Sequence, residues 1–453
     1  MGEKQKKDRE KQEGEKRRAG GSWQVSVAFL VLLAVFMLSA LAAFRFREKD
    51  ILRIGIFYGS NWEVPGTEQY DIFDKAIKKY QKVYPQIRVE YEEGITPKDY
   101  SEWLSGEILK GEEPDVFLIL DKDFNSLVSA NALKSLDKII AADAEADLSE
   151  FYDSACRSGQ YKGQQYALPF ECNPALMFVN KSLLKKEKIP MPEDDWTWDD
   201  FYRICKKVVK DTNGDGQIDQ FGCCDYTWKQ AVYANGICPF DEDGETVFTD
   251  SRFMEAVNFV KQLTNLNQNY QVTANDFDLG HVAFRPLTFS EYRTYMPYPW
   301  RIKKYSDFEW NCIQMPAGPS GENISGMDTL MAGISARTTK EKEAWEFLKM
   351  LTMDEEIQKL IYEDTSGASA LKSVSTSEDV MTLLNRDTPG GSDIDLSLLD
   401  QTIENAVILP HFKNDKEALE KADDLLTGLL LSDDDISTSM FQLKKEVDAI
   451  IRR

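Results

Sequence analysis

The stretch PDVFLILD, residues 114–121, decides the fold class of this 453-residue chain. Pro114 and Asp115 are followed by five consecutive apolar residues, so neither face of the segment is polar. A strand that is apolar on both faces is typical of a parallel sheet covered by helices on both sides. Asp121 follows directly, at the carboxyl end of the predicted strand, where open α/β sheets commonly bind ligands.

Strand and helix patterns alternate around this stretch. Residues 52–58 and 86–92 predict strands, and apolar residues between 72 and 80 recur at helical spacing. Thr197 and Asp200 form a capping-box-like start to a further helix. We therefore predict the α/β class, with parallel strands joined by crossover helices.

The composition argues against several functions. The formal net charge is −23, and an acidic excess argues against nucleic acid, whose phosphates recruit Lys and Arg. The chain has only two histidines, His281 and His411, and neither belongs to a zinc or nucleophile motif. We interpret His411 as an isolated, exposed side chain. No GxxxxGKS/T phosphate loop occurs, so any ATP would be hydrolysed by another protein, and we predict that this chain is not an enzyme.

The N-terminus is a separate part of the chain. Residues 1–22 carry eight Lys or Arg against five Asp or Glu, and residues 23–43 contain no charge in 21 positions. An uncharged helix of that length can span the roughly 30 Å hydrocarbon core of a bilayer. The basic residues before it predict a cytoplasmic tail at 1–22, a single transmembrane anchor at 23–43 and an extracytoplasmic remainder. A secretory signal cleaved near Ala40–Ala42 is the alternative.

The seven cysteines are an odd number, so in an exported chain at least one stays unpaired or pairs between chains. They have no repeated CxxC spacing. Cys205 lies on the apolar face of a predicted helix and is most simply a core residue. The sequence leaves open whether two of Cys223, Cys224 and Cys238 form a disulfide, and it does not determine which two would pair.

Six segments in a characteristic order connect the chain to a known family. They are LRIGIFY from residue 52, PDVFLIL from 114, YKGQQYALPFECNPALMFVNKSLLKKEKIP from 161, TWDDFYRICKKV from 197, MPAGPSGENISGMDTLMAGISARTTKEKEAWEFLKMLT from 315, and SGASALKSV from 366 with a later ILPHF. No single segment is decisive, but their order over some 400 residues is specific. Together they resemble the family 1 extracellular solute-binding proteins of bacterial ABC importers, the group that contains maltose-binding protein.

The resemblance implies the periplasmic-binding-protein type II fold, in which two α/β lobes hold the ligand in the cleft between them. The chain would cross between the lobes near residues 167–173 and again near 286–292. The expected lobes consist of four stretches, 51–168 plus 293–345 for lobe 1 and 175–285 plus 346–453 for lobe 2.

A sugar site needs planar aromatic rings for C–H faces and fixed carboxylates or amides for hydroxyl groups. The stretch EYRTYMPYPW, residues 291–300, is the most suggestive, because the resemblance places it beside the second crossing and its two prolines favour a loop. Tyr292 is the best match to a ligand-stacking aromatic of the family. Alternatively, these rings cover the junction of the lobes. The stretch contributes Glu291, Tyr292, Tyr295 and Trp300 as candidates.

The other candidates lie on segments that the resemblance places along the cleft. Asn173 aligns with a ligand-contacting position of sugar-binding relatives, and Trp228 resembles an aromatic that lines the second lobe. An acidic residue taken alone is more often a solvated surface group, so this prediction depends on position. The remaining ligand-binding candidates are Asn61, Trp62, Glu63, Asp121, Glu171 and Asp328.

The stretch DTNGDGQIDQFG imitates a calcium loop. Asp211, Asn213, Asp215 and Asp219 could hold a structural calcium, but Gly222 stands where an EF-hand has its bidentate Glu. Many proteins of the resembling family carry a similar loop after the TWDDF helix. We predict a loop whose acidic side chains cap its turns, with calcium as the alternative. No cofactor is expected to be required.

The resemblance implies a monomeric binding protein at the cell membrane, which captures a carbohydrate outside the cytoplasm. An oligosaccharide is the leading candidate for this ligand. It would deliver this ligand to the permease subunits of an ABC importer, served by a separate ATPase. One alternative is an anchored receptor whose closed form signals to a sensor kinase. Another is an enzyme acting on surface glycan, with two carboxyl groups about 5–10 Å apart.

Overall fold

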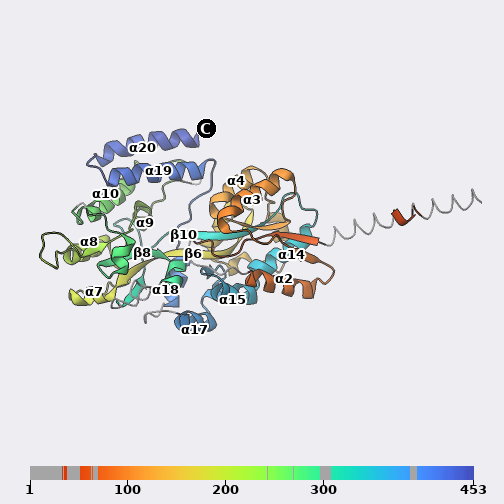
Figure 1. Ribbon diagram of the computed structural model, residues 1–453. Helices are drawn as coiled ribbons and strands as arrows, with labels where there is room; N and C mark the ends of the chain where they lie inside the picture. The colour runs from red at the N-terminus through yellow and green to blue at the C-terminus, as the bar shows by residue number, and fades with distance from the viewer. Residues whose placement is uncertain are drawn as a thin grey trace, which may run out of the picture.

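The computed structural model of the chain has two α/β lobes that lie side by side (Figure 1). No helix within the described residues is long and apolar enough to cross a membrane. The predicted tail 1–22, nearly all of the predicted anchor 23–43, Glu63 and Trp300 lie outside the described residues. The structure describes residues 33, 35–37, 51–62, 64, 70–241, 243–268, 270–295, 308–387 and 395–453.

Lobe 1 is built around a buried sheet. β1 (Ile51–Gly55) pairs in parallel with β2 (Arg88–Glu90) and with β3 (Val116–Ile119), and β10 (Met327–Ile334) pairs antiparallel with β3. All four residues of β3 are buried, as its uninterrupted apolar sequence predicts. The helices of this lobe are α2 (Asp71–Val83), α3 (Pro97–Lys110), α4 (Asp121–Ser129), α5 (Asp137–Ala142), α14 (Glu341–Thr352) and α15 (Glu355–Asp364).

Lobe 2 continues the sheet with a second set of strands. β8 (Val282–Thr288) pairs in parallel with β7 (Phe221–Cys223). β9 (Trp310–Ile313) pairs antiparallel with β6, the long strand that both lobes share and that is described next. The predicted capping box at Thr197 and Asp200 is present and starts α8. The helices of this lobe are α7 (Lys181–Lys186), α8 (Trp198–Val208), α9 (Trp228–Ala234), α10 (Ser251–Asn265), α11 (Ala274–Asp278), α19 (Asp415–Leu430) and α20 (Ile436–Ile451).

One long strand, β6 (Ala167–Asn180), runs through both lobes. Its first half, to Pro174, pairs with β10, and its second half, from Ala175, pairs with β8 and β9. The strand order is β2-β1-β3-β10-β6-β8-β7, with β9 and β11 (Ala368–Ser369) also on β6. The sheet is therefore mixed rather than parallel, because the strands that pass between the lobes run against their neighbours.

Two predicted lobe boundaries differ from the structure. The boundary at 345/346 falls inside α14, and Trp345 and Phe347 belong to the same lobe 1 core. β9 pairs with the lobe 2 half of β6, although its residues were expected in lobe 1. The chain re-enters lobe 1 where Met327 pairs with Pro174, later than the predicted crossing at 286–292.

A third apolar cluster joins the two lobes. It contains Cys172 and Phe178 from the two halves of β6, together with Trp310 of β9 and Leu399. A small hairpin lies beside it. The elements of this region are α6 (Asp153–Ser158), β4 (Gln160–Tyr161), β5 (Gln164–Gln165), α12 (Phe289–Thr294), α16 (Lys372–Ser375), α17 (Glu378–Asp387) and α18 (Leu396–Glu404).

Candidate functional site

One edge of the lobe 1 sheet gathers several predicted ligand-binding residues. β1 and β3 are parallel, so the loop holding Asn61 and Trp62 and the loop beginning at Asp121 leave the sheet at the same edge. β10 runs the opposite way, so its first residues also lie there, with Asp328 paired to Asn173. The topology thus places two carboxylates and one tryptophan together.

Asp121 and Asp328 are surrounded by protein yet open to solvent. The Asp121 side chain keeps 44% of its surface exposed, and Asp328 is also exposed. Desolvation, helped by the charge of Asp121, nevertheless raises the pKa of Asp328 to about 6, against the opposing charge of Lys229. Desolvation also raises the pKa of Asp121. The two carboxylates thus lie close enough for one charge to affect the other, and both keep contact with solvent.

His411 lies against this edge on the segment that leads into α19 of lobe 2. Its side chain is only 7% exposed, with Nδ1 3.3 Å from Asp415 Oδ2 and Nε2 3.9 Å from Asp121 Oδ1. Nε2 has no hydrogen-bond partner among the described residues. Burial lowers the pKa of His411, but the hydrogen bond to Asp415 and the charge of Asp121 raise it more, so the net shift is upward.

The expectation that His411 is isolated and exposed was therefore wrong. The ILPHF segment was the available signal, since the family resemblance placed it near the cleft. The burial itself depends on Asp121, on Asp415 and on the ring of Phe124, 4.7 Å away between centroids. Two of these come from a distant part of the sequence, so no local pattern around His411 predicts its environment.

The two lobes touch beside an open pocket close to His411. Asn125 of α4 donates hydrogen bonds to Phe412 O and to Asp415 Oδ1, which joins lobe 1 to the start of α19. The pocket has a volume of about 630 Å³ and lies between the joining region and lobe 2. Its lining includes Arg157 of α6 and Lys162 of the small hairpin in the joining region, Phe240 and Asp241 from lobe 2, and His411.

Trp62 is a partly exposed aromatic side chain whose orientation is held by a hydrogen bond. Its indole Nε1 donates to Glu171 Oε1 at 2.9 Å. The same oxygen accepts from Thr365 Oγ1 at 2.7 Å and from Gly367 N at 2.6 Å. Burial raises the pKa of Glu171, although these three donors favour its charged form. Glu171 is thus buried and holds the Trp62 indole in place, while Trp62 keeps part of its surface exposed.

Tyr292 and Tyr295, expected in a ligand-binding loop, are buried instead. Tyr292 is 3% exposed and lies in helix α12, which ends immediately before Tyr295. Both rings pack around Phe178 and Trp310, with centroid separations of 5.4–6.0 Å. Thr288 and Glu291 form a capping box that starts this helix. The alternative interpretation, in which the rings cover the junction of the lobes, agrees with this packing.

Trp228 and Asn173 are also buried. Trp228 is 1% exposed, and its Nε1 donates to Asp423 Oδ1 at 2.8 Å. Asn173 Oδ1 accepts a hydrogen bond from Ser290 N at 2.9 Å. Both side chains are therefore engaged with the protein itself, and neither presents a free face to a ligand in this conformation.

The acidic loop of lobe 2 uses its side chains to cap its own turns, as predicted. Asp211 accepts hydrogen bonds from Gly214 N and Gly216 N. Asp219 accepts from Thr212 N and Thr212 Oγ1, and these bonds lower its pKa. Asn213 and Asp215 each accept from the backbone two residues on. Within the described residues, no group of three or more His, Cys, Asp or Glu side chains is placed to hold a metal.

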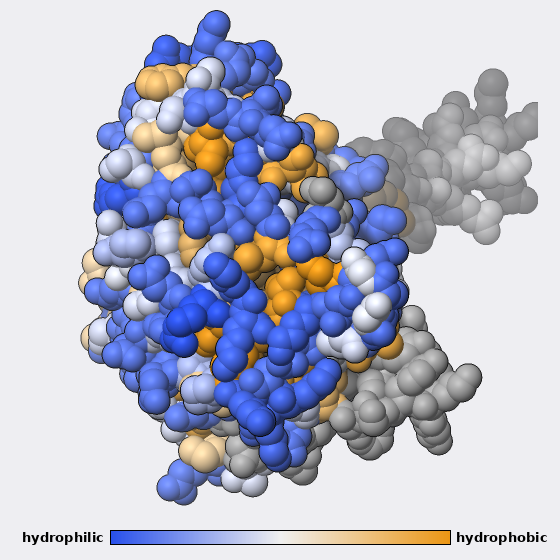
Figure 2. Space-filling view, turned by 90° about the vertical axis from the view of Figure 1, so that its left-hand side faces the viewer, coloured by the Kyte–Doolittle hydropathy of each residue, from blue (hydrophilic) through white to orange (hydrophobic). Residues whose placement is uncertain are grey.

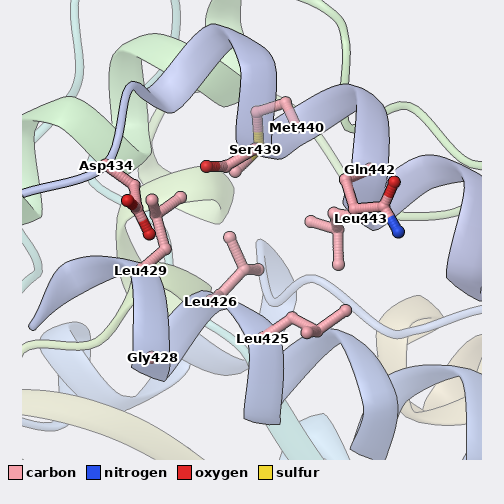
Figure 3. A pocket seen from close by; sticks show the side chains of 9 residues that line it. All are labelled: Leu425, Leu426, Gly428, Leu429, Asp434, Ser439, Met440, Gln442 and Leu443. Carbon is pink, nitrogen blue, oxygen red and sulfur yellow. The ribbon is translucent and has the colours of Figure 1, made fainter. Parts of the chain in front are cut away.

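A separate pocket lies between α19 and α20, on the outer part of lobe 2 (Figures 1 and 3). Leu426, Leu429 and Leu443 line it, with Ser439 and Gln442 among its few polar residues. Elsewhere this end of the molecule is mostly hydrophilic, with apolar side chains gathered near the middle of the face (Figure 2). Asp434 contributes the one carboxylate among its lining residues, no aromatic ring lines it, and the pocket is a seam between two helices.

Comparisons with known proteins agree with this architecture. The model of a family described as bacterial extracellular solute-binding protein matches residues 75–385. An arabinooligosaccharide-binding protein of Bacillus subtilis is 22% identical over 245 residues, which cover 53% of this chain and 55% of that protein. The aligned part thus spans only about half the length of that relative.

Solved structures with low sequence identity have the same fold. A cyclic α-maltosyl-1,6-maltose binding protein of Arthrobacter globiformis has a TM-score of 0.74 at 14% identity, covering 89% of this chain and 99% of that one. An ABC substrate-binding protein of Listeria monocytogenes, solved with cycloalternan, has a TM-score of 0.64 at 19% identity, covering 88% and 98%.

Proposed function

Because the chain belongs to the family of bacterial extracellular solute-binding proteins, whose members bind solutes rather than catalyse reactions, we propose that it captures an oligosaccharide between its lobes for an ABC importer. The observation that carries the proposal is the pair of solvent-open carboxylates, Asp121 and Asp328, at the sheet edge that faces lobe 2. Carboxylate oxygens are strong acceptors for sugar hydroxyl groups.

Each group of the edge has a role in this proposal. Asp121 and Asp328 accept hydrogen bonds from hydroxyl groups, and the Trp62 ring covers an apolar C–H face of the sugar. Glu171 orients Trp62 through the indole N–H. His411 and its neighbours complete the wall from lobe 2. A site with two carboxylates in a chain of net charge −23 disfavours phosphorylated or strongly anionic ligands.

Closure of the lobes would transmit binding to the permease subunits. β6 changes partners between Pro174 and Ala175, and β10 begins beside that point at Met327. We place the hinge there, because a few residues at the ends of packed elements can absorb the change in backbone angles. The ligand is then delivered to permease subunits that work with a separate ATPase.

Location at the cell membrane is part of the same proposal. Residues 23–43 serve as a single transmembrane anchor, with the basic tail 1–22 in the cytoplasm. The binding lobes are then extracytoplasmic, and the protein acts as a monomer that stays close to its permease.

A thermal-shift screen against a saccharide library, followed by calorimetry, tests the proposal. A ligand present at 100 times its dissociation constant stabilises the folded state by about 2.7 kcal/mol, so a binding oligosaccharide should raise Tm clearly. Sugar phosphates and amino acids serve as matched negative classes. A Tm increase with an amino acid or a sugar phosphate, and none with any neutral saccharide, would overturn it.

A further inference from the structure

His411 is a buried histidine that touches both lobes. The segment around it belongs to lobe 2, because the next residue, Phe412, lies in the lobe 2 core with its ring centroid 5.0 Å from that of Phe240. Two carboxylates face the imidazole. Asp415 begins α19 of lobe 2, and its Oδ2 lies 3.3 Å from His411 Nδ1. Asp121 begins α4 of lobe 1, and its Oδ1 lies 3.9 Å from His411 Nε2.

The protonation state of the imidazole determines how many of these contacts are favourable. A neutral imidazole has one N–H, so in either tautomer it can donate toward one carboxylate while a lone pair faces the other. The imidazolium has two N–H groups and can donate toward both. The side chain is only 7% exposed, and Nε2 has no hydrogen-bond partner within the described residues. A buried polar atom without a partner is costly, so the site favours the charged form.

We propose that His411 is a proton-dependent latch between the lobes, which pairs with Asp121 when it is charged and thereby favours the closed conformation. The inference rests on the proposed function, in which the lobes close on the ligand. Opening would carry Asp121 away with lobe 1 and leave His411 beside Asp415 of its own lobe. Closure therefore strengthens proton binding at His411. By reciprocity, a proton strengthens the binding of a ligand that the closed form holds.

The nearest groups around the ring favour the proton. Burial lowers the pKa of His411, but the hydrogen bond to Asp415 and the charge of Asp121 raise it more. The backbone carbonyl of Ser158, at the end of α6, acts in the same upward direction. Asp328 adds a further negative charge beside Asp121. The part of the site nearest to the imidazole is thus acidic.

Cations on neighbouring elements oppose the proton only in part. Lys229 of α9 acts on Asp328 as an opposing charge, and Arg157 of α6 pairs with Asp153 at 3.5 Å. Both cations therefore have an acidic partner of their own. The other charged residues that line the pocket beside His411 are Lys162, Asp241 and Asp243.

The latch should act on the acid side of neutrality. As pH falls through the raised pKa of His411, the charged form is gained and ligand binding strengthens. The gain ends where Asp121 itself takes up a proton, and burial raises the pKa of Asp121, which narrows the window from below. A carboxylate has two oxygens, so pairing of Oδ1 with His411 leaves Oδ2 of Asp121 available to a ligand hydroxyl group.

NMR of the imidazole rings tests the pairing without any ligand. The full chain, labelled with carbon-13 at histidine Cε1, is titrated in detergent from about pH 5 to about pH 8.5. The chain has only two histidines, so the variant His281→Gln leaves the signal of His411 alone. Asp121→Asn and Asp415→Asn should each lower the pKa of His411. Asp379→Asn, at an exposed position of α17, is the control and should leave it unchanged. An unchanged pKa in Asp121→Asn would overturn the pairing across the lobes.

Calorimetry tests the effect of the latch on binding. The saccharide that gives the largest thermal shift is titrated into the wild type and into His411→Gln at about pH 8 and about pH 6. Both proteins contain Asp328, so its own titration affects both affinities alike. The ratio of wild-type to variant affinity should rise by roughly threefold to tenfold as pH falls between these values. A ratio that does not change with pH would overturn the latch.

The two measurements separate the latch from the proposed function. The NMR titration involves no saccharide and does not depend on the folding of the His411 variant. A chain that binds no saccharide but shows the lower His411 pKa in Asp121→Asn would refute the proposed function and support the pairing. A chain that binds saccharide with a constant affinity ratio would support the proposed function and refute the latch.

Discussion

The aromatic cluster around Tyr292 and the carboxylate edge around Asp328 lie along the same central strands, yet they differ in burial. The cluster is closed: Tyr292 packs with Phe178 and Trp310 and is almost inaccessible to solvent. The edge is open: Asp328 reaches solvent although the surrounding protein raises its pKa to about 6. Residue type alone favoured the rings as the ligand site, whereas position in the sheet favours the carboxylates.

This difference in burial predicts different roles for the two regions. A ring that packs on all sides stabilises the junction of the lobes, and a carboxylate at the end of a strand remains free to accept hydrogen bonds. Substitutions in the cluster should therefore change stability first. Substitutions at the edge should change ligand affinity first.

The largest expected effect is on stability, from Tyr292→Ala. Removing a buried aromatic side chain should lower the free energy of unfolding by about 3–5 kcal/mol, measured by chemical denaturation. Tyr292→Phe keeps the ring and is the matched control. Saccharide affinity of the folded Ala variant should stay close to that of the wild type. A Tyr292→Ala protein that is as stable as the wild type but no longer binds saccharide would show that the aromatic cluster contributes to binding rather than to stability.

Trp62→Ala should come next, and its effect should be on affinity. Loss of the ring removes the stacking surface. We therefore expect calorimetry to record a dissociation constant that is roughly threefold to tenfold higher, which is a loss of about 0.5–1.5 kcal/mol in binding free energy. Trp62→Phe, which keeps a ring but loses the bond to Glu171, should bind better than the Ala variant. Equal affinity in all three proteins would remove Trp62 from the site.

A smaller effect should appear as a pH dependence of stability. The pKa of Asp328 is about 6 in the folded state against about 3.9 unfolded, so between these values the folded state binds more protons. Stability should then rise as pH falls from 7 to 5, and His411, with its raised pKa, contributes in the same direction.

Solvent exposure limits the Asp328 contribution to less than about 1 kcal/mol. Tm measured between pH 5 and 7.5 should depend on pH more weakly in Asp328→Asn than in the wild type. Asp143 does not contribute to the change in stability between pH 5 and 7.5, because hydrogen bonds from Lys349 and Trp345 hold its pKa at about 2. An identical pH profile in the variant would contradict the raised pKa.

The smallest effect is expected from chelation. The loop carboxylates of Asp211 and Asp219 already accept backbone N–H groups, so removing divalent cations should leave Tm within error of the untreated protein. Differential scanning fluorimetry with and without EDTA measures this. A clear drop in Tm that calcium restores would establish the structural calcium in place of a self-capped loop.

Local patterns in the sequence predicted much of the fold. The apolar run at 116–120 gave rise to the fully buried β3, and the capping pair Thr197 and Asp200 starts α8 where it was expected. The same signal was present and overlooked at Thr288 and Glu291, which begin α12 and bury Tyr292. The long strand β6 could not be foreseen in the same way, because its change of partners depends on strands far away in the sequence.

The site was less predictable than the fold. Asp121, Asp328 and Trp62 follow from strand ends and from the family resemblance, and the structure brings them to one edge. Whether Trp228 or Asn173 faces a ligand depends on tertiary packing, and both turned out to be buried. Periodicity and spacing describe a side chain's own element, but not the elements that cover it.

The most direct test of the central claim compares Asp121→Asn and Asp328→Asn with a matched surface substitution. Asp379→Asn is the control, because Asp379 is 78% exposed on α17 and pairs only with Lys359 among the ion pairs of the described residues. Hydrogen bonds to a charged group contribute about 1.5–3 kcal/mol. Calorimetry with the saccharide that gives the largest thermal shift should therefore record affinity about 10- to 100-fold weaker in the two edge variants and unchanged in the control. Wild-type affinity in both edge variants would contradict the account.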